Sequence, residues 1–419
     1  MSSVAARGGD QSRPGTPSLL RELNDRAALR LLLDGRSLTR SQLSELTGVS
    51  KVTVAQMLAR LEERGLVAVA GEQAGGRGPN ATLYAVVPSS AYVAGLYIEH
   101  GQVSTAVADV TGKVIAEVRE DTTGEPEPIG LVRSAVDRVC ARAGISVEKL
   151  SAFVIGSPGV VDPRTGDPTL TINLPEWHEG VLEGLRGALR KPVTIENDVN
   201  LAAMAERAAV GAAAGAEDFV LVWIGIGLGL ATMIGGRLHR GVSGAAGEIG
   251  WLPVSGAPVT SEVRVPARGG LQSLVGAEPV RQLALRYGFG GQSAPSGEAA
   301  CSGQSATGGA AADYVRAAVA ALAGDLLPPA GATPPPVAPG PAWTGPAASG
   351  TAEASAGPAS RDTAEAAAAF LDELAHRVAL GVTAVCTVLD PGLVVLGGEI
   401  GLAGGAVLAD RVAAQVARM

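Results

Sequence analysis

The sequence predicts a mixed α/β protein with a smaller, mostly helical module at its N-terminus. Two observations predict this class. Residues 19–88 hold three helix-type hydrophobic stripes followed by two short β-like runs. From Tyr92 onward, strand-type and helix-type patterns alternate, which is typical of an α/β domain. Residues 290–362 interrupt this alternation with Ala, Gly, Pro and Ser, and their composition predicts a mostly disordered insertion.

The composition narrows the classes of protein to consider. The cysteines Cys140, Cys301 and Cys386 have no CxxC spacing, so neither a disulfide framework nor a thiolate metal site is indicated. We therefore predict no metal and no cofactor. Residues 1–18 lack an apolar core, which predicts a flexible leader and not a signal peptide. The chain has no run of about 18 apolar residues, so we expect a cytoplasmic protein with no membrane partner.

The helices of the N-terminal module, residues 19–88, carry clear start and stop signals. A hydrophobic stripe over 19–33 ends at Asp34-Gly35. Thr39 and Gln42 form a capping box for a second helix that runs through Leu46. Gly48 supplies a turn, Ser50 is the N-cap of a third helix, and Gly65 ends that helix.

Two β-like runs, 66–70 and 82–87, follow the third helix and flank a glycine-rich tip. Helix, helix, turn, helix and hairpin together predict a winged helix-turn-helix, which places its third helix in the major groove of DNA. Residues 1–88 hold 11 Lys and Arg against 8 Asp and Glu, a balance of +3, which leaves 22 against 33, or −11, for the rest. A basic head on an acidic body fits a DNA-binding module joined to a regulatory domain.

Individual DNA contacts follow from the helical pattern. If Val52, Ala55, Leu58 and Leu61 face the core of the module, the side chains that face the bases are Ser50, Lys51, Thr53 and Gln56. The cations predicted to reach phosphates are Arg40, Lys51 and Arg60. Arg77, at the wing tip, is predicted to enter a minor groove. The alternative is a helix-turn-helix that serves only packing or dimerisation.

The larger domain is predicted to cover 91–289 and 363–419. Its predicted strands are 93–97, 103–109, 114–118, 153–156, 193–195, 219–224 and 393–396, and its predicted helices are 129–143, 199–209 and 362–389. Inside the predicted insertion we expect one helix near 311–327. The chain ends at Met419 after one short helical run, 407–418, so we expect either a shortened C-terminal part or a part of it displaced by the insertion.

Four ordered motifs in this domain carry a family resemblance. They are GSPGVVDPRTG (156–166), NLPEW (173–177), ENDVNLAAMAE (196–206) and GVSGAAGEIG (241–250). With the winged module and its GGRGP, they resemble the ROK family, which groups sugar kinases with sugar-responsive repressors on the actin-like ATPase fold. The resemblance covers roughly 20–275 and 379–410. It implies a two-lobed actin-like domain behind the winged helix-turn-helix.

The phosphate-binding residues of the family kinases are replaced in this chain. The kinase turn DxGGT corresponds to Tyr97, Glu99, His100 and Gly101, so the metal-serving carboxylate is lost and bulky side chains stand near the phosphate. The threonine of the second glycine motif is Ile226. Gly397-Gly398 resembles the adenosine loop, although an ordinary strand-to-helix turn explains it equally well. We therefore expect no enzyme activity and assign no catalytic residue.

The family's zinc site is also replaced, because its ligand positions are Val263, Val265, Gly270 and Trp251. The resemblance assigns the ligand-binding residues as Asn197, Asp198, Glu248, Trp251 and Gln272. Asp198 could instead cap the following helix, and Glu248 could be a surface turn carboxylate. Trp251 and Gln272 stand where the kinases have His and Glu, which implies altered ligand choice or lost binding.

These features predict a DNA-binding transcriptional regulator, and the resemblance implies a repressor. We expect it to bind a double-stranded DNA operator as a homodimer or homotetramer and to sense a sugar, sugar derivative or sugar phosphate. Two alternatives stay open. One is a regulator without a small-molecule effector, whose larger domain serves dimerisation. The other, which the substitutions disfavour, is an active ATP-dependent sugar kinase.

Overall fold

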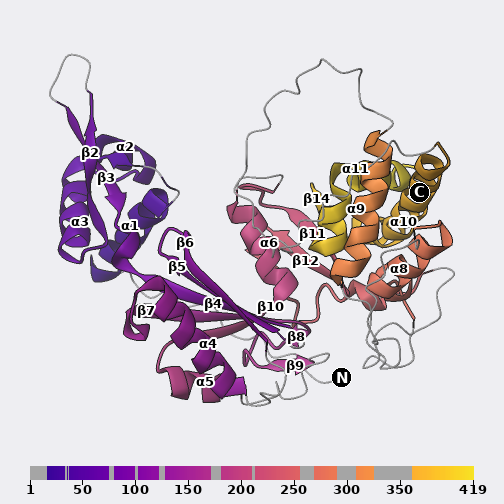
Figure 1. The fold of residues 1–419 in the computed structure, drawn as a ribbon. Coiled ribbons are helices and arrows are strands. Elements are labelled where there is room, and N and C mark those ends of the chain that lie inside the picture. The colour runs from indigo at the N-terminus through magenta and orange to yellow at the C-terminus, as the bar shows by residue number, and fades with distance from the viewer. Residues whose placement is uncertain are drawn as a thin grey trace, which may run out of the picture. The chain divides into compact units, whose positions relative to one another are not determined.

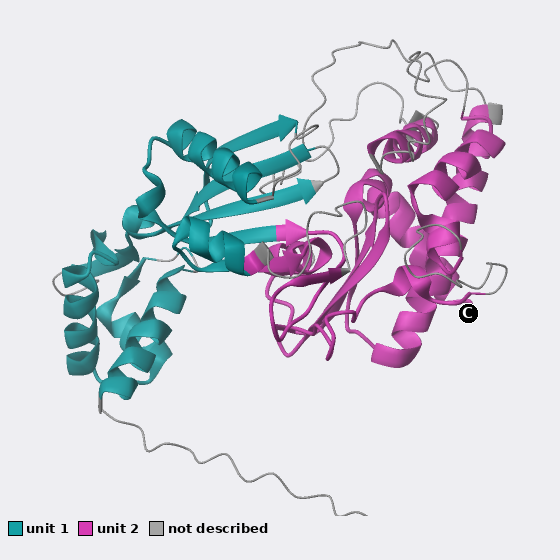
Figure 2. Cartoon of the chain, turned by 90° about the horizontal axis from the view of Figure 1, so that it is seen from below, with its two compact units in different colours: residues 1–155, 183–194 teal, residues 156–182, 195–419 magenta. Residues whose placement is uncertain are grey.

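The computed structural model describes residues 17–33, 35, 37–74, 80–99, 102–121, 128–170, 181–209, 213–254, 269–289, 308–324 and 361–419 (Figure 1). The chain divides into two compact units, shown in different colours in Figure 2. Unit 1 comprises residues 1–155 and 183–194, and unit 2 comprises residues 156–182 and 195–419.

The N-terminal module has the predicted order of elements. Its helices are α1 (Pro17–Leu33), α2 (Arg40–Thr47) and α3 (Lys51–Glu63), and its strands are β1 (Leu38–Thr39), β2 (Val67–Gln73) and β3 (Ala81–Val86). The strands form a sheet in the order β1-β3-β2. The predicted capping box is present, since the Thr39 side chain accepts from the backbone of Gln42 and the Gln42 side chain accepts from the backbone of Thr39. A core that includes Ala28, Leu43, Leu58 and Tyr84 joins the helices to the sheet. The winged helix-turn-helix is confirmed.

The rest of unit 1 is built on a five-stranded sheet in the order β10-β7-β4-β5-β6. Its strands are β4 (Tyr92–Glu99), β5 (Gln102–Asp109), β6 (Val114–Asp121), β7 (Leu150–Ser157) and β10 (Val193–Asn197), which follow the short helix η1 (Pro88–Ser90). The helices are α4 (Pro128–Ala143), η2 (Val147–Lys149) and α5 (Val181–Leu189). Alternate residues of β5 are buried, as expected of a strand with one face on a core. The ends of β7 and β10 belong to unit 2.

Unit 2 is built on a second sheet, which has the order β13-β12-β11-β14 in the described part of the chain. Its strands are β11 (Phe219–Ile224), β12 (Leu228–Ile234), β13 (Arg237–Leu238) and β14 (Val394–Gly397), beside a hairpin of β8 (Val160–Val161) and β9 (Pro168–Leu170). The helices are α6 (Asp198–Ala208), η3 (Ile249–Trp251), α7 (Gln272–Val275), α8 (Ala277–Arg286), α9 (Gly308–Gly324), α10 (Arg361–Leu389) and α11 (Gly398–Val416). β12, β13, β8 and β9 were not among the predicted strands.

Helices cover both faces of the second sheet. Along β11, Phe219 and Leu221 belong to a core cluster with residues of α6, while Val220, Val222 and Ile224 belong to a larger cluster with α8, α9, α10 and α11. A strand buried on both faces reads as a continuous hydrophobic run, and FVLVWI is such a run.

The predicted insertion at 290–362 contains a core helix. Helix α9 begins at Gly308 and ends at Gly324, and Ala311, Ala312, Val315 and Ala318 are fully buried in the large cluster of unit 2. The helix predicted near 311–327 is therefore confirmed, and its small alanine side chains let it pack closely against α10 and α11. The remaining stretches, 290–307 and 325–360, lie outside the described residues.

Two general features of the described residues complete the fold. None of their helices is both long enough and apolar enough to span a membrane. Cys140 and Cys386 are free thiols. Burial raises the pKa of both thiols above its ordinary value, with further contributions from nearby carboxylates.

Candidate nucleic-acid interface and candidate ligand site

Helix α3 starts at a well-formed cap. The Ser50 hydroxyl accepts a hydrogen bond from the Thr53 amide at 3.2 Å, and the hydroxyl oxygens of Ser50 and Thr53 lie 2.9 Å apart. Gly48 makes the turn after α2 with a φ of 71°. At the other end, Gly65 donates to Glu62 and Leu66 donates to Leu61, a Schellman arrangement. These contacts confirm the predicted caps. They also join the Ser50 and Thr53 hydroxyls by a hydrogen bond.

The predicted core face of α3 is partly wrong. Leu58 and Leu61 are buried, but the other buried residues are Val54 and Met57, and Val52 is 68% exposed. Positions 54, 57, 58 and 61 follow the helical repeat of 3.6 residues, whereas spacing by threes from Val52 drifts around the helix. Lys51 and Gln56 are exposed, as predicted.

Two predicted phosphate contacts have partners inside the module. Arg40 is exposed, and its guanidinium donates to the Tyr84 hydroxyl at 2.5 Å and lies over the Tyr84 ring. The Arg60 guanidinium instead binds both carboxylate oxygens of Asp25 in α1, at 2.5 and 3.3 Å. Asp25 is only 9% exposed, so Arg60 neutralises a buried charge, and its predicted phosphate contact stays a prediction. Arg77 lies outside the described residues, and its minor-groove contact stays a prediction.

Three of the four family motifs meet in unit 2. The Asn197 amide donates to the Gly159 carbonyl at 3.0 Å, which joins the END segment to the loop after β7. Gly244 approaches the same hairpin so closely that an added Cβ would lie 1.9 Å from the Val161 oxygen. The NLPEW motif lies outside the described residues. The structure therefore brings together residues separated by more than eighty positions in the sequence.

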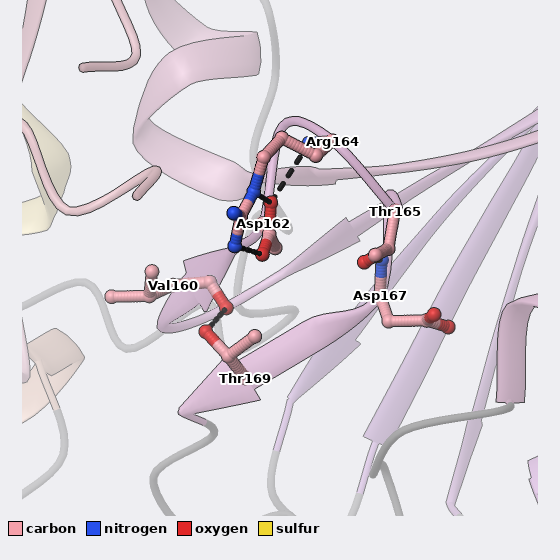
Figure 3. A network of polar contacts seen from close by, with 6 residues as sticks. All are labelled: Val160, Asp162, Arg164, Thr165, Asp167 and Thr169. Carbon is pink, nitrogen blue, oxygen red and sulfur yellow. Dashed lines mark hydrogen bonds and ion pairs between the residues drawn. The ribbon is translucent and has the colours of Figure 1, made fainter. Parts of the chain in front are cut away.

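A polar network shapes the β8–β9 hairpin (Figure 3). The Asp162 carboxylate accepts from the Arg164 amide at 2.8 Å and from its guanidinium at 2.7 and 3.1 Å. These hydrogen bonds lower the pKa of Asp162 to about 2. The Asp167 amide donates to the Thr165 hydroxyl, and the Thr169 hydroxyl donates to the Val160 carbonyl. These hydrogen bonds stabilise the hairpin. They engage the side chains of Asp162, Arg164 and Thr165 within it.

The Asn197 side chain is hydrogen-bonded within unit 2. Its Oδ1 accepts from the Asn200 amide at 3.0 Å, so Asn197, and not Asp198, is the N-cap of α6. The preceding Glu196 is 6% exposed and accepts from Asn200 at 2.9 Å and from Arg240 at 2.7 Å. This ion pair, in which Glu196 is buried and Arg240 is partly exposed, stabilises the start of α6.

Glu248 and Asp198 form the acidic part of the candidate ligand site. Burial, together with the charge of Asp198, raises the pKa of Glu248 to about 7. Glu248 is partly buried, so it is not the surface carboxylate of the alternative interpretation. At neutral pH a large fraction of Glu248 is protonated and can donate a hydrogen bond as well as accept one.

Gln272 is held by the glycine loop after β11. Its Oε1 accepts from the Leu228 amide at 2.8 Å, and its Nε2 donates to the Ile226 carbonyl at 3.3 Å. Its Oε1 also lies against Gly250, where an added Cβ would be 3.2 Å away. Trp251, in η3, is partly buried and follows Gly250 directly. The amide predicted to bind a ligand therefore has internal partners.

Glu399 lies against the same glycine loop. A Cβ on Gly225 would lie 2.2 Å from its Oε2, so the carboxylate is in direct contact with the loop. Gly397 ends β14 and Gly398 begins α11, so this pair is a strand-to-helix turn whether or not it also serves a nucleotide. Tyr97 and Glu99 lie within β4. The described residues contain no group of three or more His, Cys, Asp or Glu placed to hold a metal ion.

Sequence reasoning missed three features of these sites. The 3.6-residue repeat identifies Val52 as exposed, so that signal was present. The Asp25–Arg60 and Glu196–Arg240 pairs join residues 35 and 44 positions apart, and no periodicity identifies such partners. Glu399, which follows Gly397-Gly398, was not among the residues that the sequence analysis identified.

The chain was compared with known families and proteins. A model of the ROK family matches residues 94–419, and a model of the MarR family matches residues 22–78. A xylose repressor of Caldicellulosiruptor bescii is 27% identical over 247 residues, which are 58% of this chain and 61% of that protein. The DNA-binding transcriptional dual regulator NagC of Escherichia coli is 25% identical over 252 residues, 59% of this chain and 61% of that protein. These matches span less than two thirds of the relatives' length.

Solved structures share the fold. A ROK family transcriptional regulator, a homologue of the E. coli MLC protein, superposes with a TM-score of 0.66 at 17% identity, covering 95% of this chain and 88% of that chain. A ROK hexokinase from Thermus thermophilus gives a TM-score of 0.51 at 22% identity, covering 78% and 88%. Regulators and kinases therefore share this architecture. With the family model matching from Ala94 to the last residue, the chain belongs to the ROK family.

Proposed function

We propose that this protein is a DNA-binding transcriptional regulator, acting as a repressor, whose ROK domain binds a sugar or sugar derivative and does not transfer phosphate. The observation that carries the proposal is the exposed face of α3. Lys51 and Gln56 lie on it without a hydrogen-bond partner among the described residues. No acidic residue occurs between Lys51 and Leu61, so nothing on this stretch repels phosphate. The relatives named as a xylose repressor and as a DNA-binding transcriptional dual regulator support a function in transcription.

The proposed effector site comprises Asp198, Glu248 and Trp251. A carboxylate beside a partly protonated carboxyl offers both hydrogen-bond acceptors and a donor, which suits vicinal hydroxyls. The aromatic ring of Trp251 suits the apolar face of a sugar. Asn197 and Gln272 act in this proposal by holding α6 and the glycine loop, since their amides are engaged there.

The absence of phosphoryl transfer rests on the glycine loop. The kinase threonine position is Ile226, which is 52% exposed and supplies no hydroxyl. The Glu399 carboxylate against Gly225 places an acidic group where phosphate oxygens would need hydrogen-bond donors. Steady-state release of ADP from ATP in the presence of a hexose would refute this part of the proposal.

A regulator without an effector is a second candidate, favoured by the internal partners of Asn197 and Gln272. A thermal-shift screen with xylose, N-acetylglucosamine, glucose and their phosphates separates the two, because a ligand that binds only the folded state raises the melting temperature. We expect at least one compound to raise it in the wild type and not in a Glu248→Ala, Asp198→Ala double variant. A flat response to every compound would favour the effector-free regulator.

DNA binding is tested by enriching bound fragments from a library of random duplexes at low salt. We expect a palindromic consensus, because two copies of the module would read two half-sites. Failure to retain any duplex at low salt would refute the proposal, since counterion release favours binding most strongly there.

A further inference from the structure

The exposed Val52 is the one feature of α3 that packing does not explain. Val54, Met57, Leu58 and Leu61, the other large apolar residues of this helix, are fully buried, whereas Val52 is 68% exposed. A single exposed apolar side chain is ordinary on a protein surface and by itself identifies no site. The position of Val52 indicates a role in recognition, because Val52 lies in the first turn of the helix, directly after Lys51.

Val52 and Gln56 form one patch. Residues four apart on a helix lie on the same side, with Cβ atoms about 5–6 Å apart. Ser50 and Thr53, the neighbouring polar side chains, are bonded to each other in the cap. The patch therefore offers the two methyl groups of Val52 and the primary amide of Gln56, beside one cation at Lys51. The positive charge of Lys51 complements the phosphates of a duplex.

We infer that Val52 reads the methyl group of a thymine in the major groove, while Gln56 reads an adenine in the same or an adjacent base pair. Thymine carries the C5-methyl, the apolar group of the major-groove edge, and a glutamine amide pairs with N6 and N7 of adenine. Base pairs are stacked about 3.4 Å apart, so two side chains at this separation reach one pair or its neighbour. The inference rests on the proposed function, and it predicts that each half-site contains an A·T pair at this place.

The test compares thymine with deoxyuridine, which lacks only the methyl group. The consensus duplex obtained with the full chain is resynthesised with each thymine replaced singly by deoxyuridine, and affinity is measured by fluorescence anisotropy. At one thymine per half-site we expect the affinity of the wild type to fall about fourfold, the equivalent of ~0.8 kcal/mol for one buried methyl-sized group. The Val52→Ala variant should bind the thymine duplex several times more weakly and lose its discrimination against deoxyuridine.

Val114→Ala is the matched control, because Val114 is 55% exposed and lies on β6, outside the module. It should retain both the affinity and the discrimination of the wild type. Equal affinity of the wild type for every deoxyuridine duplex, or unchanged discrimination in Val52→Ala, would overturn the inference while leaving DNA binding intact. A library from which no duplex is enriched would instead refute the proposed function. Melting temperatures within about one degree of the wild type confirm that Val52→Ala is folded.

Discussion

The exposed face of α3 and the END segment of unit 2 use their polar side chains in opposite ways. On α3, Lys51 and Gln56 are exposed without a hydrogen-bond partner among the described residues. In the END segment, Glu196 and Asn197 are bonded to Arg240, Asn200 and Gly159. Lys51 and Gln56 were predicted to bind DNA, and Asn197 was predicted to bind a ligand. The difference teaches that a family motif can be retained for packing, whereas exposed polar groups on a capped helix remain available for recognition.

The largest expected effect concerns pH and Glu248. The folded-state pKa of about 7 exceeds the ordinary value of 4.5, so between these values the folded protein holds more protons than the unfolded chain. This contribution to stability is complete below pH 4.5 and is lost as the pH rises to 7. Its size is on the order of 3 kcal/mol. This contribution is measured by urea unfolding of the wild type and of Glu248→Gln at pH 4.5 and 7.5. If the free energy of unfolding changes equally with pH in both proteins, the raised pKa of Glu248 is contradicted.

The next largest effect is the loss of stability that follows when the Glu196–Arg240 ion pair at the start of α6 is broken. Arg240→Met leaves the Glu196 carboxylate, 6% exposed, without its cation and should lower the free energy of unfolding by about 2–3 kcal/mol. Arg237→Met is the control, since Arg237 is exposed on the neighbouring β13, and it should cost less than about 0.5 kcal/mol. If chemical denaturation gives the same loss of unfolding free energy for Arg240→Met and Arg237→Met, the Glu196–Arg240 pair contributes no specific stability.

The two cations of α3 should separate binding from stability. Lys51→Ala should weaken DNA binding about tenfold, or ~1.4 kcal/mol, and reduce the salt slope by about 1, with an unchanged melting temperature. Arg60→Ala should lower the melting temperature, because Asp25 then loses its partner. Salt-dependent binding and thermal unfolding of both variants distinguish these outcomes. A reversal of the two phenotypes would mean that Arg60 contacts phosphate.

The smallest effect concerns the N-cap of α6. Asn197→Ala removes the acceptor of the Asn200 amide and should destabilise the protein by about 1 kcal/mol. Asn197→Asp keeps the acceptor oxygen of the cap but loses the hydrogen bond to the Gly159 carbonyl, so it should recover only part of this loss. A neutral Asn197→Ala that nevertheless abolishes an effector's thermal shift would restore Asn197 as a ligand-binding residue.

Local signals predicted much of the fold. The Thr39–Gln42 capping box, the Ser50 cap and the Gly48 turn depend on neighbouring residues, so sequence spacing identified them. The strands β4, β5 and β11 followed from hydrophobic patterns for the same reason. The helix near 311–327 was predicted, but its place in the core was not, because alanine contributes little to a hydrophobic stripe and the burial of α9 depends on α10 and α11.

The candidate ligand site was less predictable. The resemblance assigned Asn197 and Gln272 to one ligand site, but it could not reveal that their amides have hydrogen-bond partners inside unit 2. Those partners, Gly159 and Leu228, lie 38 and 44 positions away. Burial by distant elements likewise sets the pKa of Glu248. Such properties arise from tertiary packing, which no short sequence window contains.

The claim that the α3 face binds DNA is tested most directly by a Lys51→Ala, Gln56→Ala double variant. Its affinity for the selected duplex is measured by fluorescence anisotropy at two salt concentrations, beside its melting temperature. We predict a loss of more than tenfold in specific affinity at an unchanged melting temperature. Wild-type affinity in this variant would contradict the account.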